Sequence, residues 1–127
     1  MKDTDQTLIL KRNLDDVFNE RDESRRMQAI QAMYSEDAVF YEGEDSFEGW
    51  PAISKRFHAI LAPTPPDFVF RVVRQAGRIE DLEQLSWELG PPTGQPVASG
   101  LDVAIVKDQR ISVLYTFIDS AAEELKG

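Results

Sequence analysis

Two stretches decide the fold of this chain: Met33–Ile53, MYSEDAVFYEGEDSFEGWPAI, and Gly100–Asp119, GLDVAIVKDQRISVLYTFID. In the first, a helix ends and a short β-prone run covers residues 38–42. A new helix then begins at Gly49-Trp50-Pro51, since the first turn of a helix tolerates proline. The second stretch predicts two strands joined by a polar connection at residues 107–110.

The rest of the chain completes a simple order of elements. Apolar residues at helical spacing predict a first helix that runs to about Arg21, a second that ends at Met33-Tyr34, and a third over 51–61. Residues 43–49, which include three acidic side chains, are expected to form a loop. After Asp67 the sequence is typical of strands, over 68–75, 82–89, 97–106 and 111–118. Helices followed by a strand meander predict one α+β domain over residues 1–127, with helices on one face of a mostly antiparallel sheet and 120–127 as a loose tail.

Composition excludes several classes of function. The chain has 127 residues, no cysteine and a formal net charge of −9. Disulfides, thiolate metal sites and cysteine nucleophiles are therefore excluded. The basic residues are scattered, so we expect neither nucleic acid nor an anionic membrane as a partner. No apolar run is long enough to span a membrane, and the N-terminus lacks a signal-peptide pattern, so we expect a cytoplasmic protein.

The local sequences resemble the SnoaL-like branch of the NTF2-like superfamily, which includes ketosteroid isomerases, limonene-epoxide hydrolases and polyketide cyclases. The similar strings are Met33-Tyr34 with Asp37-Ala38-Val39-Phe40, Phe47-Glu48-Gly49, and Gly100-Leu101-Asp102-Val103 with Gln109-Arg110-Ile111. The resemblance implies a cone-shaped fold with one cavity, and a homodimer formed by the outer face of the sheet. It places the isomerase's catalytic base at Glu42 and its acidic hydrogen-bond donor at Ile105.

Glu42 is the first candidate for chemistry. Strand alternation places Ala38, Phe40 and Glu42 on one face, so Glu42 follows Phe40 at the mouth of the cone. A carboxylate beside aromatic walls loses hydration and becomes a competent general acid or base. The alternative is that Glu42 begins an acidic surface loop. His58, the only histidine, is a second catalytic candidate. It comes directly after Phe57 and lies beside the apolar stripe of its helix, a position more typical of a surface residue.

Asp102 is expected to face outward, with Val103 and Ile105 facing the cone, and to pair across a dimer interface. On the last strand, Tyr115 and Phe117 share the outer face, and a homodimer that buries them is the simplest partner. The alternation and the resemblance together assign these residues to the ligand cavity: Phe18, Tyr34, Phe40, Phe57, Ile105, Leu114, Thr116 and Ile118.

Three functions stay open. The first is the binding of a small apolar or polycyclic molecule, with no cofactor and no metal. The second is a cofactor-independent isomerase, cyclase or lyase in which Glu42 moves a proton next to a carbonyl. The third is a dimeric accessory or interaction domain whose cavity is filled by side chains. A cavity with hydrogen-bond donors would favour catalysis, and a cavity without donors would favour binding alone.

Overall fold

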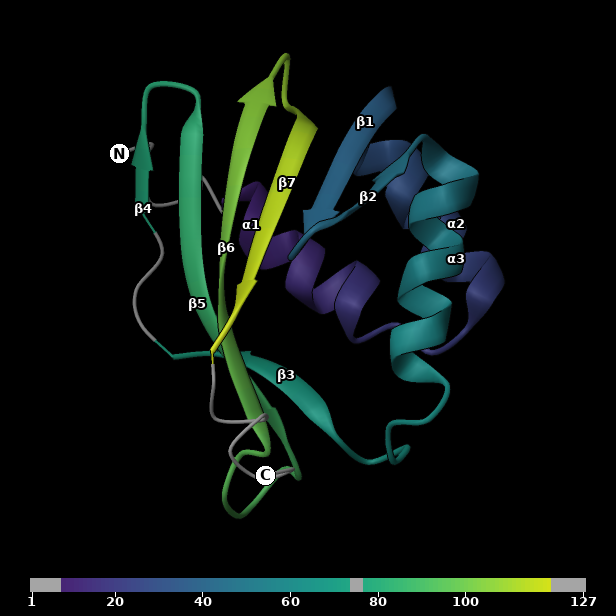
Figure 1. Ribbon diagram of the computed structural model, residues 1–127, viewed down its shortest axis with the longest axis vertical. Coiled ribbons are helices and arrows are strands. Elements are labelled where there is room, and N and C mark those ends of the chain that lie inside the picture. The colour runs from purple at the N-terminus through teal and green to yellow at the C-terminus, as the bar shows by residue number, and fades with distance from the viewer. Residues whose placement is uncertain (1–7, 74–76, 120–127) are drawn as a thin grey trace.

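A curved sheet with helices packed on one face forms the protein, as the computed structural model in Figure 1 shows. The structure describes residues 8–73 and 77–119. The expected tail at 120–127 lies outside these residues. The helical elements are α1 (Ile9–Asn13), the π-helical turn η2 (Leu14–Phe18), α2 (Glu23–Met33) and α3 (Trp50–Leu61). The strands are β1 (Tyr34–Glu42), β2 (Asp45–Glu48), β3 (Val69–Val72), β4 (Gly77–Ile79), β5 (Leu82–Gly90), β6 (Ala98–Lys107) and β7 (Arg110–Ile118).

The sheet has the order β2-β1-β7-β6-β5-β3, and β4 pairs with β5 beside this path. β1 and β7 run parallel, while every other pair of neighbouring strands among the described residues is antiparallel. The α+β class with a mostly antiparallel sheet is therefore confirmed. β6 and β7 are joined by Asp108 and Gln109, whose positive φ values of 52° and 63° are those of a type I′ hairpin turn.

Two local expectations were wrong in detail. The acidic segment expected as a loop contains β2, which pairs with β1 so that Phe47 lies opposite Phe40. The turn between them uses Gly43 at φ 61°, a conformation that glycine adopts without strain. The first helix, expected to run to about Arg21, ends at Phe18. Its last turn, η2, is π-helical, and Asn19 then leaves the helical conformation at φ −92°, ψ 1°.

Helix α3 packs beside β1 and β2 and carries one face into the core. It begins after Gly49, with proline at its first turn as expected, and it buries Ile53, Phe57 and Leu61 at i, i+4 and i+8. The ring of Phe57 stacks on Phe40 of β1 with centroids 5.0 Å apart. The helix thereby covers the inner face of β1 close to Glu42.

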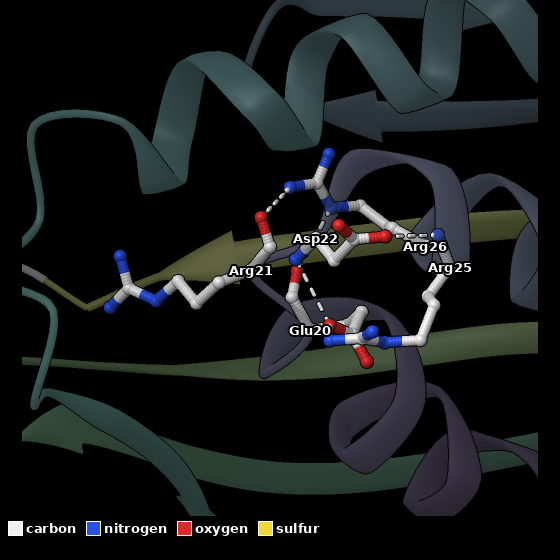
Figure 2. A network of polar contacts seen from close by, with 5 residues as sticks. All are labelled: Glu20, Arg21, Asp22, Arg25 and Arg26. Atoms are coloured by element: carbon white, nitrogen blue, oxygen red, sulfur yellow. Dashed lines mark hydrogen bonds and ion pairs between the residues drawn. The ribbon is translucent and has the colours of Figure 1, made fainter.

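The turn between η2 and α2 is held by a polar network, shown in Figure 2. Asp22 caps α2, because its carboxylate accepts the Arg25 backbone N–H at 2.8 Å. Arg26 is buried and donates to the backbone carbonyls of Glu20 and Arg21. The turn is therefore fixed from both sides, and the side chain of Arg21 projects away from it.

Arg21 ties this turn to the end of α3. Its guanidinium donates to four backbone carbonyls, at distances of 2.8 to 3.2 Å. The acceptors belong to Leu61, Thr64, Pro65 and Phe68. One side chain thus supplies donors to carbonyls at the end of a helix and in the following loop, where the carbonyls of Leu61 and Pro65 also accept a backbone N–H.

Candidate functional site

A row of four residues crosses the concave face of the sheet, one on each of four neighbouring strands. Leu85 of β5 lies opposite Asp102 of β6, Asp102 lies opposite Thr116 of β7, and Thr116 pairs with Glu42 of β1. Neighbouring strands lie about 4.8 Å apart. The row therefore brings two carboxylates to the inner face, with one threonine between them.

An apolar cavity of about 160 Å³ lies between this face and the helices. Aromatic and aliphatic side chains from both layers form almost all of the surface that faces it, and Glu42 and Thr116 lie at its edge. The lining residues are Phe18, Phe40, Glu42, Phe57, Ile60, Leu61, Phe70, Trp87, Leu89, Ala98, Thr116 and Ile118. An open groove of about 510 Å³ shares Glu42, Thr116 and Ile118 with it, so the cavity and the outer groove meet at these three side chains.

Asp102 is fully buried behind the cavity wall. Its Oδ1 accepts hydrogen bonds from Trp87 Nε1 and Thr116 Oγ1, both at 2.9 Å, while Oδ2 has no hydrogen-bond partner among the described residues. Burial raises the pKa of the Asp102 carboxyl from 3.8 to about 7, although the two hydrogen bonds oppose this shift. A proton-sensitive group therefore stands against two residues of the cavity wall.

The outward orientation expected for Asp102 was wrong, and so was the inward one expected for Ile105. Asp102, Ala104 and Val106 are buried, whereas Val103 and Ile105 alternate with them on the other face and are half-buried. The physical reason is that Trp87 and Thr116 supply hydrogen bonds to the carboxylate on the inner face, and these offset part of its desolvation.

Gly100 allows Trp87 to take its position. A Cβ atom at Gly100 would lie 2.4 Å from Cζ2 of the Trp87 ring and 2.6 Å from the backbone oxygen of Phe117. The indole thus rests directly on the backbone of β6, in register with Gly100. This close approach sets the ring beside the cavity with its N–H aimed at Asp102.

Glu42 lies where the alternation of β1 places it, on the inner face with Ala38 and Phe40. Its carboxylate is not free. Arg56 of α3 donates Nε to Oε1 at 2.6 Å and Nη2 to Oε2 at 3.1 Å. The Arg56 guanidinium also lies over the ring of Phe47, 5.6 Å from its centroid. An ion pair between β1 and α3 therefore holds both oxygens of Glu42 at the mouth of the cavity.

The other candidate residues separate into three groups. The cavity wall contains the expected residues Phe18, Phe40, Phe57, Thr116 and Ile118. Tyr34 and Leu114 are fully buried in the core and lie outside the set of described lining residues, and the Tyr34 hydroxyl donates to Asn13 Oδ1 at 2.7 Å. His58 is exposed on α3 and lines neither the cavity nor the groove, so the structure does not bring it to the site.

The sequence contained a signal for the part of the site that was missed. A glycine inside a strand marks a close approach by another group, and Gly100 precedes Asp102 by two residues, which puts both on one face. A tryptophan on the neighbouring strand could then have been placed against that face. The wall contributed by Phe70, Leu89 and Ala98 carried no comparable signal.

The outer face of the sheet exposes aromatic side chains, as expected. Tyr115 and Phe117 are 38% and 59% exposed. Tyr41 of β1 stacks on Tyr115 with ring centroids 5.2 Å apart and planes 9° apart. Within residues 8–73 and 77–119, no group of three or more His, Cys, Asp or Glu side chains could hold a metal ion. None of the helices in this part of the chain is long and apolar enough to cross a membrane.

The sequence matches none of the protein-family models and none of the curated proteins with which it was compared. Solved structures do match. A SnoaL-like protein of Agrobacterium tumefaciens, proposed to be an isomerase, is 25% identical, with a TM-score of 0.79 over 87% of this chain and 94% of that one. A proposed SnoaL-like polyketide cyclase of Jannaschia sp. is 16% identical, with a TM-score of 0.70 over 91% and 86%.

A third similar structure is a proposed polyketide cyclase of Sinorhizobium meliloti, 18% identical, with a TM-score of 0.68 over 91% of this chain and 99% of that one. The chain therefore has the NTF2-like α+β fold, and the resemblance to SnoaL-like proteins seen in its sequence is confirmed at the level of fold. Because one fold supports many activities, the function has to be argued from the cavity itself.

Proposed function

We propose that this protein binds a compact, largely apolar small molecule in the cavity between α3 and the concave face of the sheet. The walls are aromatic and aliphatic, and the two described lining residues with a side-chain oxygen, Glu42 and Thr116, are register partners at the edge where the cavity meets the outer groove. Ligand sites typically combine such apolar walls with a few placed polar groups. Its structural neighbours include proteins proposed to be polyketide cyclases, which is a small-molecule chemistry.

The volume favours a ligand with a single ring. An apolar cavity of about 150 Å³ lined by Leu, Ile and Phe binds benzene in a well-studied engineered protein, and the cavity here measures about 160 Å³. A polycyclic ligand, the other possibility expected from the sequence, would have to extend past Thr116 and Ile118 into the open groove. The compact ligand needs no such extension.

Binding is favoured over catalysis because the side-chain hydrogen-bond donors of the cavity lining already have an acceptor within the protein. Among the described lining residues, Trp87 and Thr116 are those whose side chains carry an N–H or O–H, and both donate to Asp102. A reaction that develops charge on a carbonyl oxygen needs donors aimed at that oxygen. The second candidate is an isomerase, cyclase or lyase in which Glu42 moves a proton. The position of Glu42 in the cavity supports it, whereas the Arg56 ion pair and the committed donors disfavour it.

The binding test fills the cavity. Ala98 lines it, and Ala98→Phe puts a ring into its space, whereas Ala59→Leu is a matched enlargement at an exposed position of α3. In NMR titrations with toluene, we expect saturable binding to the wild type and to Ala59→Leu, and none to Ala98→Phe. Equal binding to all three proteins would place the ligand elsewhere and refute the proposal. For the catalytic alternative, Glu42→Gln must abolish any proton-transfer activity that is found.

We also propose a homodimer formed by the outer face of the sheet. The exposed Phe117 and the stacked pair of Tyr41 and Tyr115 support it, because an apolar stripe on an open sheet is stabilised by a partner. Sedimentation velocity should show a wild-type dimer that Phe117→Asp converts to a monomer, and a monomeric wild type would refute the dimer. The third function, an accessory domain with a filled cavity, is disfavoured by the open cavity. A cytoplasmic location stays a prediction, which cell fractionation tests.

A further inference from the structure

The hydrogen-bonding character of the cavity wall is set by a residue behind it. A tryptophan side chain has one donor and no acceptor, and a threonine hydroxyl has one proton and two lone pairs. Trp87 Nε1–H and Thr116 Oγ1–H both point at Oδ1 of Asp102, each at a donor–acceptor distance of 2.9 Å. Asp102 therefore consumes both side-chain donors of the described wall, and Thr116 has lone pairs alone left for a ligand.

These two donors are not free to turn toward a ligand. Asp102 is fully buried, and no cationic side chain among the described residues forms an ion pair or hydrogen bond with it, so its carboxylate is stabilised there by the hydrogen bonds from Trp87 and Thr116. Loss of one of these hydrogen bonds would raise the free-energy cost of burying the carboxylate, since its oxygens would lack partners in a low-dielectric interior. The arrangement thus holds the wall in one hydrogen-bonding state.

The second polar group of the wall is also an acceptor. Each oxygen of the Glu42 carboxylate accepts one hydrogen bond from Arg56 and retains lone-pair capacity. Glu42 and Thr116 are register partners on β1 and β7, so their backbones lie about 4.8 Å apart. Two acceptors therefore stand side by side at the edge of an otherwise apolar cavity.

We propose that this cavity selects a single-ring ligand that carries a hydroxyl group, and that Asp102 sets this preference by holding the proton of Thr116 away from the ligand. A ligand hydroxyl donates its proton to Thr116 Oγ1. A ketone of the same shape presents an acceptor to an edge that offers acceptors alone, and its carbonyl oxygen loses its water without gaining a donor. The inference rests on the proposed function, and it adds the chemical class of the ligand.

The test compares cyclohexanol with cyclohexanone, which share ring size and differ in the hydroxyl, with methylcyclohexane as an apolar reference. Calorimetric or NMR titration of the wild type should show cyclohexanol binding about tenfold more tightly than cyclohexanone, as expected for one hydrogen bond gained against one left unmade. Thr116→Val should remove this preference and keep the affinity for methylcyclohexane. Thr64 lies outside the cavity lining and its hydroxyl donates to the Ile60 carbonyl, so Thr64→Val should keep the preference.

The outcomes separate this inference from the proposed function. If none of the three compounds binds, the proposed function fails, and this inference fails with it. If the compounds bind but wild-type protein holds cyclohexanone as tightly as cyclohexanol, or Thr116→Val keeps the preference, binding stands and the inference is overturned. Should Thr116→Val fail to fold, Thr116→Ser retains the hydroxyl and must retain the tenfold preference, and its loss there would equally overturn the inference.

Discussion

Replacing Gly100 by alanine should disturb the cavity wall at Trp87. The new Cβ would lie 2.4 Å from Cζ2 and 2.8 Å from Cε2 of Trp87, and 2.6 Å from the backbone oxygen of Phe117. Carbon atoms in contact lie about 3.5–4.0 Å apart. The indole must therefore move by about 1 Å or more, and its N–H moves away from Asp102.

The expected loss of folding free energy in Gly100→Ala has two parts. Forcing an extra methyl group into a packed site costs about 1–3 kcal/mol. Weakening the hydrogen bond from Trp87 to the Asp102 carboxylate costs about 1.5–3 kcal/mol, the range for bonds to charged groups. We therefore expect Gly100→Ala to lower the free energy of unfolding by about 3 kcal/mol or more.

Urea denaturation followed by circular dichroism measures this loss, and the indole N–H resonance of Trp87 reports the broken hydrogen bond. Gly77→Ala is the matched control, because a Cβ there meets no atom within 4 Å, and it should change stability by at most about 0.5 kcal/mol. Trp87→Phe should rescue part of the loss in Gly100→Ala, since the smaller ring makes the two changes non-additive. A Gly100→Ala protein as stable as the wild type, with an unshifted indole resonance, would refute the reasoning.

Because burial raises the pKa of Asp102 from 3.8 to about 7, the folded protein binds the proton more tightly than the unfolded chain. Its stability relative to Asp102→Asn should therefore fall as pH rises from about 4 to about 7 and level off above, by about 4 kcal/mol at most in urea titrations. Arg21→Met removes four bonds to carbonyls and should cost about 2–3 kcal/mol, whereas Arg25→Met, at a side chain that is 69% exposed, should cost at most about 0.5 kcal/mol. Glu42→Gln weakens a partly exposed ion pair with Arg56 and should lower stability by less than about 1 kcal/mol; a larger thermal shift would show that the pair is a structural anchor.

The fold could be predicted because its signals are local. The apolar stripe at Ile53, Phe57 and Leu61 and the proline at residue 51 define α3 without reference to the rest of the chain. The hairpin between β6 and β7 follows from two apolar runs that flank Asp108-Gln109. In each case a repeating pattern of side chains matches one element, so no distant contact has to be known.

The site could be predicted in part, and its failure has a specific cause. The alternation of side chains along β6 was predicted correctly, but the wrong set was assigned to the inner face. Val103 and Ile105 were placed there because they are apolar. The inner face is decided instead by Trp87 and Thr116, residues on two other strands that donate hydrogen bonds to the Asp102 carboxylate. The partner of Glu42 was missed for the same reason, since Arg56 lies 14 positions away on α3. Long-range polar pairs leave no periodic trace in a sequence.

The most direct test of the central claim is a crystal structure of the protein grown with 4-iodophenol, a single ring with one hydroxyl and an anomalous scatterer. We expect an anomalous peak inside the cavity between Phe57 and Trp87, with the phenol oxygen within hydrogen-bonding distance of Thr116 or Glu42. Anomalous peaks at surface positions alone, with the cavity side chains unmoved, would contradict the claim that this cavity is a ligand site.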